Sequence, residues 1–119
     1  MGDVLTRLLL GGFVRLHVLY HAAREPVFGV ELMAELRRHG YRLGAGTLYP
    51  LLHQLEEVGY LSCSSEVVAG KRRKYYRATP EGAAALESAK EKLRELVAEL
   101  GHDRTPRPRA GSSPGRRRS

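Results

Sequence analysis

The stretch from Gly44 to Tyr60 constrains the fold most, because its pattern is that of one short amphipathic helix between two glycines. Its apolar residues recur at intervals of three and four, which gathers them on one face of an α-helix. They are Leu48, Leu51, Leu52, Leu55 and Val58. Thr47, Tyr49, His53 and Gln54 fall on the other side. The helix therefore has one face for a core and one face for another partner.

Proline and glycine set the limits of this helix and of the one before it. Pro50 lacks an amide donor and crowds the preceding turn, so we expect a helix over 45–58 that starts near Ala45 or Gly46. Gly59 suits its end. Residues 28–39 predict another helix, with its inward side chains at Val30, Leu32, Met33 and Leu36. Two short helices joined by a tight turn are typical of a helix-turn-helix.

The pattern changes from helical to alternating after Gly59. Residues 60–68 and 74–78 alternate in the period of a β-strand, and the segment from Ala69 to Arg73 between them is a glycine-containing loop with a basic tip. We expect Cys63 to pack on the inner face and, of the two tyrosines Tyr75 and Tyr76, one to point inward. Residues 60–78 therefore predict a hairpin, and a hairpin after a helix-turn-helix is a wing.

One heptapeptide and two further blocks of this sequence, in the same order, resemble a known family. The residues Gly46-Thr47-Leu48-Tyr49-Pro50-Leu51-Leu52, followed by Leu55-Glu56 and Gly59, resemble the signature of the PadR family of bacterial winged-helix transcriptional regulators. The resemblance continues through Arg73-Lys74-Tyr75-Tyr76 and Thr79-Pro80-Glu81-Gly82 and covers residues 13–100. It implies that 45–58 is a recognition helix in which the proline is tolerated. Ala45 and Phe28-Gly29-Val30 depart from the family's usual proline and His-Gly-Tyr, so contacts through those side chains are not carried over.

The two longest helical patterns predict a dimer. Residues 5–23 are apolar around most of the helix, which suggests burial by more than one partner. Thr79 and Pro80 form a good helix start, and residues 79–101 carry an apolar seam near heptad spacing. The resemblance implies that both helices pack on a second copy, as in the short branch of the family with a single C-terminal helix. The predicted dimer residues are Leu16, Tyr20, Leu86, Leu93, Leu96, Val97 and Leu100.

Positive charge is concentrated in two places. Of the net charge of +7, six arginines and one aspartate in residues 102–119 account for +5, which leaves 14 basic and 12 acidic side chains in residues 1–101. Within the latter, Lys71, Arg72, Arg73, Lys74 and Arg77 lie in one short stretch. This focused charge is typical of a nucleic-acid-binding protein. The tail, 102–119, has no periodicity and is predicted to be disordered, either binding phosphates non-specifically or serving no contact.

The sequence contains one weak metal signal. His17 and His21 are four residues apart, so their imidazoles share one side of a helix. A divalent site generally needs three or four ligands, and a third is not evident unless His53, Cys63 or a partner chain supplies it. We therefore predict no metal or other cofactor. The single cysteine and the absence of an apolar run near ~20 residues favour a cytoplasmic protein without a membrane segment.

Taken together, these patterns predict a mainly α protein with a small β-hairpin: a winged helix-turn-helix over residues 1–78, followed by a dimerisation helix. We predict no enzyme, since no nucleophile and base or carboxylate pair is recognisable. The expected function is a homodimeric, sequence-specific regulator of double-stranded DNA, a repressor released by a small molecule or stress; the alternative is a non-specific architectural or protein-interaction module. The predicted DNA contacts are Thr47, Tyr49, His53, Gln54, Lys71, Arg72, Arg73, Lys74 and Tyr76.

Overall fold

The computed structural model describes residues 3–102 of the chain. Their elements, in order, are α1 (Val4–Arg24), β1 (Val27–Phe28), α2 (Gly29–Arg38), α3 (Ala45–Glu57), β2 (Leu61–Val68), β3 (Lys71–Ala78) and α4 (Pro80–His102). The chain divides after Ala89 into two units, so the second unit consists, within the described residues, of the later turns of α4. The predicted tail falls almost entirely outside the described residues.

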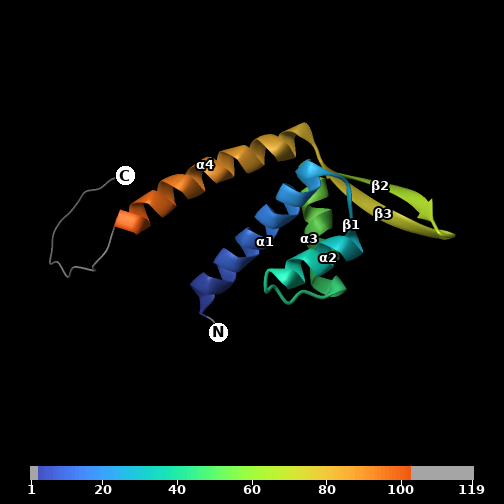
Figure 1. Cartoon of the computed structure of the whole chain (residues 1–119), viewed down its shortest axis with the longest axis horizontal. Helices are drawn as coiled ribbons and strands as arrows, with labels where there is room; N and C mark the ends of the chain where they lie inside the picture. Colours follow the sequence, from blue (N-terminus) through green and yellow to red (C-terminus); the bar gives the residue numbers. More distant parts are fainter. Residues whose placement is uncertain (1–2, 103–119) are drawn as a thin grey trace. The chain divides into compact units, whose positions relative to one another are not determined.

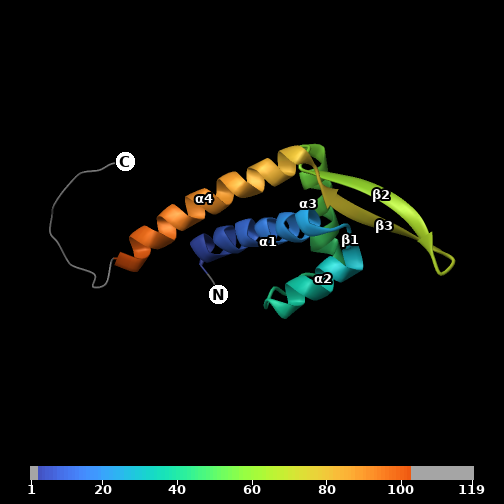
Figure 2. The same ribbon diagram turned by 45° about the horizontal axis from the view of Figure 1, so that its top comes forward.

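The first unit is a three-helix cluster with a hairpin that extends away from it (Figure 1, Figure 2). The helix α3 supplies Leu48, Leu51, Leu52 and Leu55 to the core, as its periodicity predicted. Val58 is exposed instead, because it lies at the C-cap and Gly59 then turns the chain with φ 90°. The helix starts at Ala45 and accommodates Pro50 in its second turn.

The buried face of α1 covers only part of its apolar surface. Val14, Val18, Leu19 and Ala22 are buried, whereas Leu5, Leu8 and Leu9 in the first turns are exposed. Only the later part of α1 therefore contributes to this core. A helix that is apolar on most sides does not reveal which side its neighbours will cover.

The inward face of α2 is narrower than predicted. Leu32 and Leu36 are fully buried and Met33 packs against the core, but Val30 is exposed. Val30 is two residues from Leu32, which places it about 200° away around the helix. The expectation of an inward Val30 was therefore wrong.

A three-stranded antiparallel sheet in the order β1-β3-β2 completes the first unit. The short strand β1 was not predicted; its Val27 pairs with Tyr76 and its Phe28 with Tyr75. The hairpin turn consists only of Ala69 and Gly70, both with positive φ (53° and 79°), which is the backbone that a tight two-residue hairpin requires. The basic residues Lys71 to Arg73 consequently lie in β3, not in a loop.

The junction between the hairpin and α4 is tightly built. Thr79 caps the helix, since its hydroxyl accepts a hydrogen bond from the Gly82 amide at 3.0 Å and its own amide donates to the Tyr60 carbonyl at 3.0 Å. A Cβ atom at Gly82 would overlap the Tyr60 backbone, with the carbonyl carbon 2.9 Å away. The predicted start at Thr79-Pro80 is thereby confirmed. Position 82 requires glycine because any side chain there would overlap the Tyr60 backbone.

The predicted fold class is confirmed: a mainly helical chain with a small antiparallel sheet and a long C-terminal helix. Within residues 3–102, none of the helices has the length and apolar character that crossing a bilayer requires.

Candidate DNA interface

The residues predicted to contact bases do not share one face of α3. Gly46, Pro50, His53 and Glu57 follow the line opposite the buried leucines, and all four are exposed. Thr47 and Gln54 lie on the flank that lines a groove next to α1. Tyr49 lies on the other flank. The predicted readers are therefore divided among three strips of the helix surface.

Tyr49 is held against the start of α2. A Cβ atom at Gly29 would overlap its phenol ring, whose Cζ would lie 2.7 Å away, so only glycine leaves space for the ring. The side chain of Tyr49 remains 36% exposed. Its outer edge can thus contact DNA while its ring packs against Gly29, the first residue of α2.

Gln54 is occupied by α1. Arg15 donates two hydrogen bonds to the Gln54 Oε1 atom, from Nε at 3.3 Å and from Nη2 at 3.0 Å. Arg15 also donates from Nη1 to the Gly11 carbonyl at 2.9 Å. The amide oxygen of Gln54 is therefore engaged within the protein, and Arg15 is brought next to α3 from 39 positions away.

His53 is highly exposed but has acidic neighbours. Its Nδ1 atom lies 3.9 Å from a Glu56 carboxylate oxygen, and its Nε2 atom lies 3.4 Å from one of Glu57. Two carboxylates in the last turn of α3 repel phosphate groups. The first half of α3 has no acidic residue, so it is the half suited to close approach to DNA.

The basic hairpin has two distinct faces. The β2–β3 register pairs Lys71 with Val68, Arg72 with Val67 and Arg73 with Glu66, and side chains alternate between the faces along each strand. Arg73 lies over the Phe28 ring at 6.0 Å, whereas Arg72 donates to the Ser65 hydroxyl at 3.4 Å. Lys71, Arg72, Arg73 and Lys74 are all exposed, so the hairpin offers positive charge on both faces.

The assignment of Tyr76 to DNA was wrong. This tyrosine is only 4% exposed and belongs to the core, where it pairs with Cys63 across the sheet and with Val27 of β1. Burial, reinforced by Cys63, raises the pKa of Tyr76 to about 12. The outward tyrosine is Tyr75, which contacts Phe28 edge-to-face and lies beneath Arg77 at 5.9 Å. Alternation predicted one tyrosine on each side but not which one.

Other basic residues near α3 were missed. An open groove of about 960 Å³ lies between α1, the α2–α3 loop and α3, and its lining includes Arg7, Arg15 and Arg42. Arg37 and Arg42 also line a second hollow directly before the start of α3. Arg7 and Arg15 belong to α1, far from α3 in the sequence, so only folding brings them beside the recognition helix, whereas Arg42 lies three positions before Ala45 and its place could have been predicted.

The predicted dimer residues fall into two groups. Leu86 is buried in the core of the first unit, and Leu16 packs against that core, so the assignment of Leu86 to a dimer contact was wrong. Tyr20 is half-exposed, as is Leu96, and Val97 and Leu100 are exposed further. Leu93 is partly buried. The exposed Leu5, Leu8 and Leu9 of α1 are additional apolar residues that the dimer prediction did not include.

The metal candidates His17 and His21 lie together on α1, as their spacing requires. The third histidine next to them is His39, at the end of α2. His53 lies on α3 beside Glu56 and Glu57, and Cys63 lies on β2 opposite Tyr76, so neither expected third ligand joins the pair.

Comparison with known proteins agrees with this architecture. Residues 18–88 match the family of PadR-like transcriptional regulators. Transcriptional regulator Rv3488 of Mycobacterium tuberculosis is 53% identical over 87 residues, which cover 73% of this chain and 81% of that protein. A PadR family regulator from Eggerthella lenta is 34% identical with a TM-score of 0.70 and covers 84% of this chain and 91% of its own. A PadR-like regulator from Bacillus cereus has 28% identity and a TM-score of 0.73, covering 80% and 94%.

The helix-turn-helix, its exposed second helix and the basic hairpin define a winged-helix DNA-binding protein. The family match and the relative with 53% identity narrow this class to one family. This chain belongs to the PadR-like family and is a transcriptional regulator, not an enzyme.

Proposed function

We propose that this chain is a homodimeric repressor that binds a two-fold symmetric operator in the cytoplasm and is released by an effector. The observation that carries the proposal is the contrast along α3: its first half has no acidic side chain, while Arg37 and Arg42 lie before its start. That half would enter the major groove, where base edges are read. The basic hairpin would hold the adjacent phosphates, which positions the protein.

The dimer is supported by apolar side chains that have no cover. On α1, Leu5 and Leu8 are at least 70% exposed, and on α4 Val97 and Leu100 exceed 60%. Contiguous exposed apolar residues mark interaction surfaces in soluble proteins. Two copies of each helix would cover these residues, and a two-fold dimer would present two recognition helices to two half-sites.

The dimer is tested by placing charge on α4. Val97→Glu should convert the protein to a monomer in size-exclusion chromatography with light scattering, because an unpaired buried carboxylate opposes association. Val67→Glu is the matched control, since Val67 is equally exposed but lies on the hairpin. A Val97→Glu protein that remains dimeric would place the interface elsewhere.

The operator is tested by selecting genomic fragments that the purified protein retains at physiological salt. The expected site has two related half-sites about one helical turn, 10–10.5 base pairs, apart. Mixed-sequence DNA that competes equally well would instead support the non-specific architectural role. A reporter gene placed behind the selected site should be transcribed less when the protein is present, and increased transcription would identify an activator.

An effector would act most directly at the proposed dimer interface, because a ligand there changes the spacing of the two recognition helices. Flat apolar compounds such as phenolics are the first candidates. The experiment is a thermal-shift screen in which each stabilising compound is tested for release of DNA. Compounds that stabilise the protein without releasing DNA would contradict this location.

A further inference from the structure

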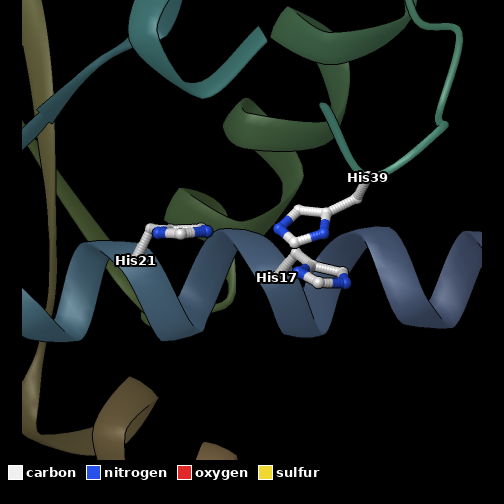
Figure 3. A group of neighbouring side chains, drawn as sticks. All are labelled: His17, His21 and His39. Atoms are coloured by element: carbon white, nitrogen blue, oxygen red, sulfur yellow. The ribbon is translucent and has the colours of Figure 1, made fainter. Parts of the chain in front are cut away.

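Three histidines from two helices converge in the first unit. His17 and His21 project from α1, and the ring of His39, at the end of α2, reaches the ring of His17 (Figure 3). The ring centroids of His17 and His39 are 4.5 Å apart. One nitrogen from each of the three rings lies within 4.8 Å of the other two. Three nitrogen atoms that can bind a metal therefore lie in one cluster.

The protein itself leaves one nitrogen atom of this cluster unsatisfied. Among residues 3–102, the His21 Nε2 atom is a buried side-chain nitrogen without a hydrogen-bond partner. A buried imidazole nitrogen without a partner is unfavourable unless another group satisfies it. A neutral imidazole with a free lone pair is also the form that binds a metal.

Glu35 supplies an oxygen donor beside the histidines. Its Oε2 atom lies 4.0 Å from His21 Nε2 and 3.9 Å from His39 Nε2, and its other oxygen pairs with Arg38. Glu35 can thus occupy a fourth position or accept a hydrogen bond from a ligating ring.

We propose that His17, His21 and His39, together with Glu35, bind a divalent transition metal ion of the zinc type. Nitrogen donors favour Zn²⁺, Co²⁺, Ni²⁺ and Cu²⁺, whereas Mg²⁺ and Ca²⁺ require oxygen donors. At the usual Zn–N distance of about 2.0–2.1 Å, tetrahedral nitrogens stand about 3.3 Å apart. Rotation of the rings about their side-chain bonds would bring the donors from the observed spacing to that spacing.

The proposed metal site connects α1 with the end of α2, and these two helices have different roles in the proposed function. α1 carries the exposed leucines of the proposed dimer interface, and His39 directly precedes Gly40, whose φ of 92° starts the turn toward α3. A metal bound across them would fix α1 relative to the helix-turn-helix. Resting on the proposed function, this makes the metal an effector whose affinity is linked to that of the operator.

The site is tested first without DNA. The full-length protein is stripped with EDTA, dialysed and titrated with Zn²⁺ by calorimetry, and with Co²⁺ by visible absorption. We expect one ion per chain, and at least about a tenfold loss of affinity in His21→Ala, His39→Ala and His17→Gln, since even outer partners of metal ligands affect affinity by 10–100-fold. Glu35→Gln should lose less.

His53→Ala is the matched control for metal binding. His53 also has two carboxylates within 4 Å but lies on α3, away from the cluster, so its loss should leave the Zn²⁺ affinity unchanged. Unfolding curves in EDTA check that each variant is folded; His39 is exposed and lies outside the core, so we expect its replacement to leave the core intact. Unchanged affinity in folded His21→Ala and His39→Ala, or loss in His53→Ala, would overturn the site.

The regulatory role is tested separately with the selected operator. Affinity is measured in EDTA and with saturating Zn²⁺, for the natural protein and for His39→Ala. We expect Zn²⁺ to change the affinity of the natural protein at least fivefold and that of the variant less than twofold. Equal affinities with and without Zn²⁺ would overturn the linkage, while failure to bind DNA in either condition would overturn the proposed function and leave the metal site standing.

Discussion

The recognition helix α3 and the hairpin β2–β3 both carry residues predicted to contact DNA, but they are embedded differently. α3 is held on three sides: its leucines fill the core, Arg15 binds Gln54, and Tyr49 rests on Gly29. The outer part of the hairpin, from Ser64 to Lys74, has no buried residue. The position of α3 is therefore fixed by its packing, whereas the outer part of the hairpin can adapt to its partner. This suits reading of bases by the first and attachment to phosphates by the second.

The largest expected effect is on stability, and it separates the two regions. Leu52 of α3 is fully buried, so Leu52→Ala should lower the free energy of unfolding by about 2–5 kcal/mol. Val67 of the hairpin is 64% exposed, and Val67→Ala should change it by no more than about 0.5 kcal/mol. Urea unfolding followed by circular dichroism measures both. Similar losses in the two variants would show that the hairpin is as firmly embedded as α3.

The next effect tests how Tyr49 is positioned. In Gly29→Ala the new methyl group would displace the Tyr49 ring, at a cost of about 1–3 kcal/mol for overpacking. The same change in a Tyr49→Ala background should cost much less, because the ring is gone. A double-mutant cycle by urea unfolding measures this coupling. Equal costs in both backgrounds would mean that the ring does not require the glycine.

Variants of α3 and of the hairpin distinguish base recognition from phosphate binding. Thr47→Ala, in the first half of α3, should cost about 1–3 kcal/mol on the selected operator and little on random DNA. Arg72→Ala, on the hairpin, should weaken both and reduce the salt dependence by about one counterion. Fluorescence anisotropy at several salt concentrations measures both variants. The roles are reversed if Arg72→Ala alone lowers discrimination.

Gln54→Ala provides a contrast within α3 itself. Since the Gln54 amide oxygen already accepts hydrogen bonds from Arg15, we expect a smaller loss of operator affinity than for Thr47→Ala. The effect of Arg15→Ala on operator affinity should also differ between the natural protein and the Gln54→Ala variant. Anisotropy titrations of both single variants and of the double variant measure the coupling. Additive losses would indicate that the Arg15–Gln54 contact has no influence on DNA binding.

The smallest effect concerns the hairpin turn. Ala69 has a φ of 53°, a left-handed conformation that asparagine adopts more readily than alanine, and Gly70 follows it. Ala69→Asn should therefore stabilise the protein by about 0.5 kcal/mol without changing operator preference. Thermal unfolding and anisotropy check the two parts. A loss of stability would mean that the turn is held by contacts other than its backbone geometry.

Much of the architecture was predictable because its signals are local. The leucine spacing of α3, the Thr79-Pro80 start of α4 and the alternation of β2 and β3 each depend on residues a few positions apart. The candidate DNA contacts were predicted only in part. Tyr76 is buried, Arg15 binds Gln54, and Arg7 lines the groove beside α3, and none of these facts follows from a local pattern.

The sequence by itself determined the succession of helices and hairpin, the family, and the exposure of a basic segment. Only the tertiary structure decided which side of α1 is buried, why Gly29 must lack a side chain, and that His39 joins His17 and His21. The physical reason is the distance along the chain over which each kind of signal extends. Helical and strand periodicity records each residue's near neighbours, whereas a core face or a cluster of ligands forms between segments whose distance along the chain bears no relation to their distance in space.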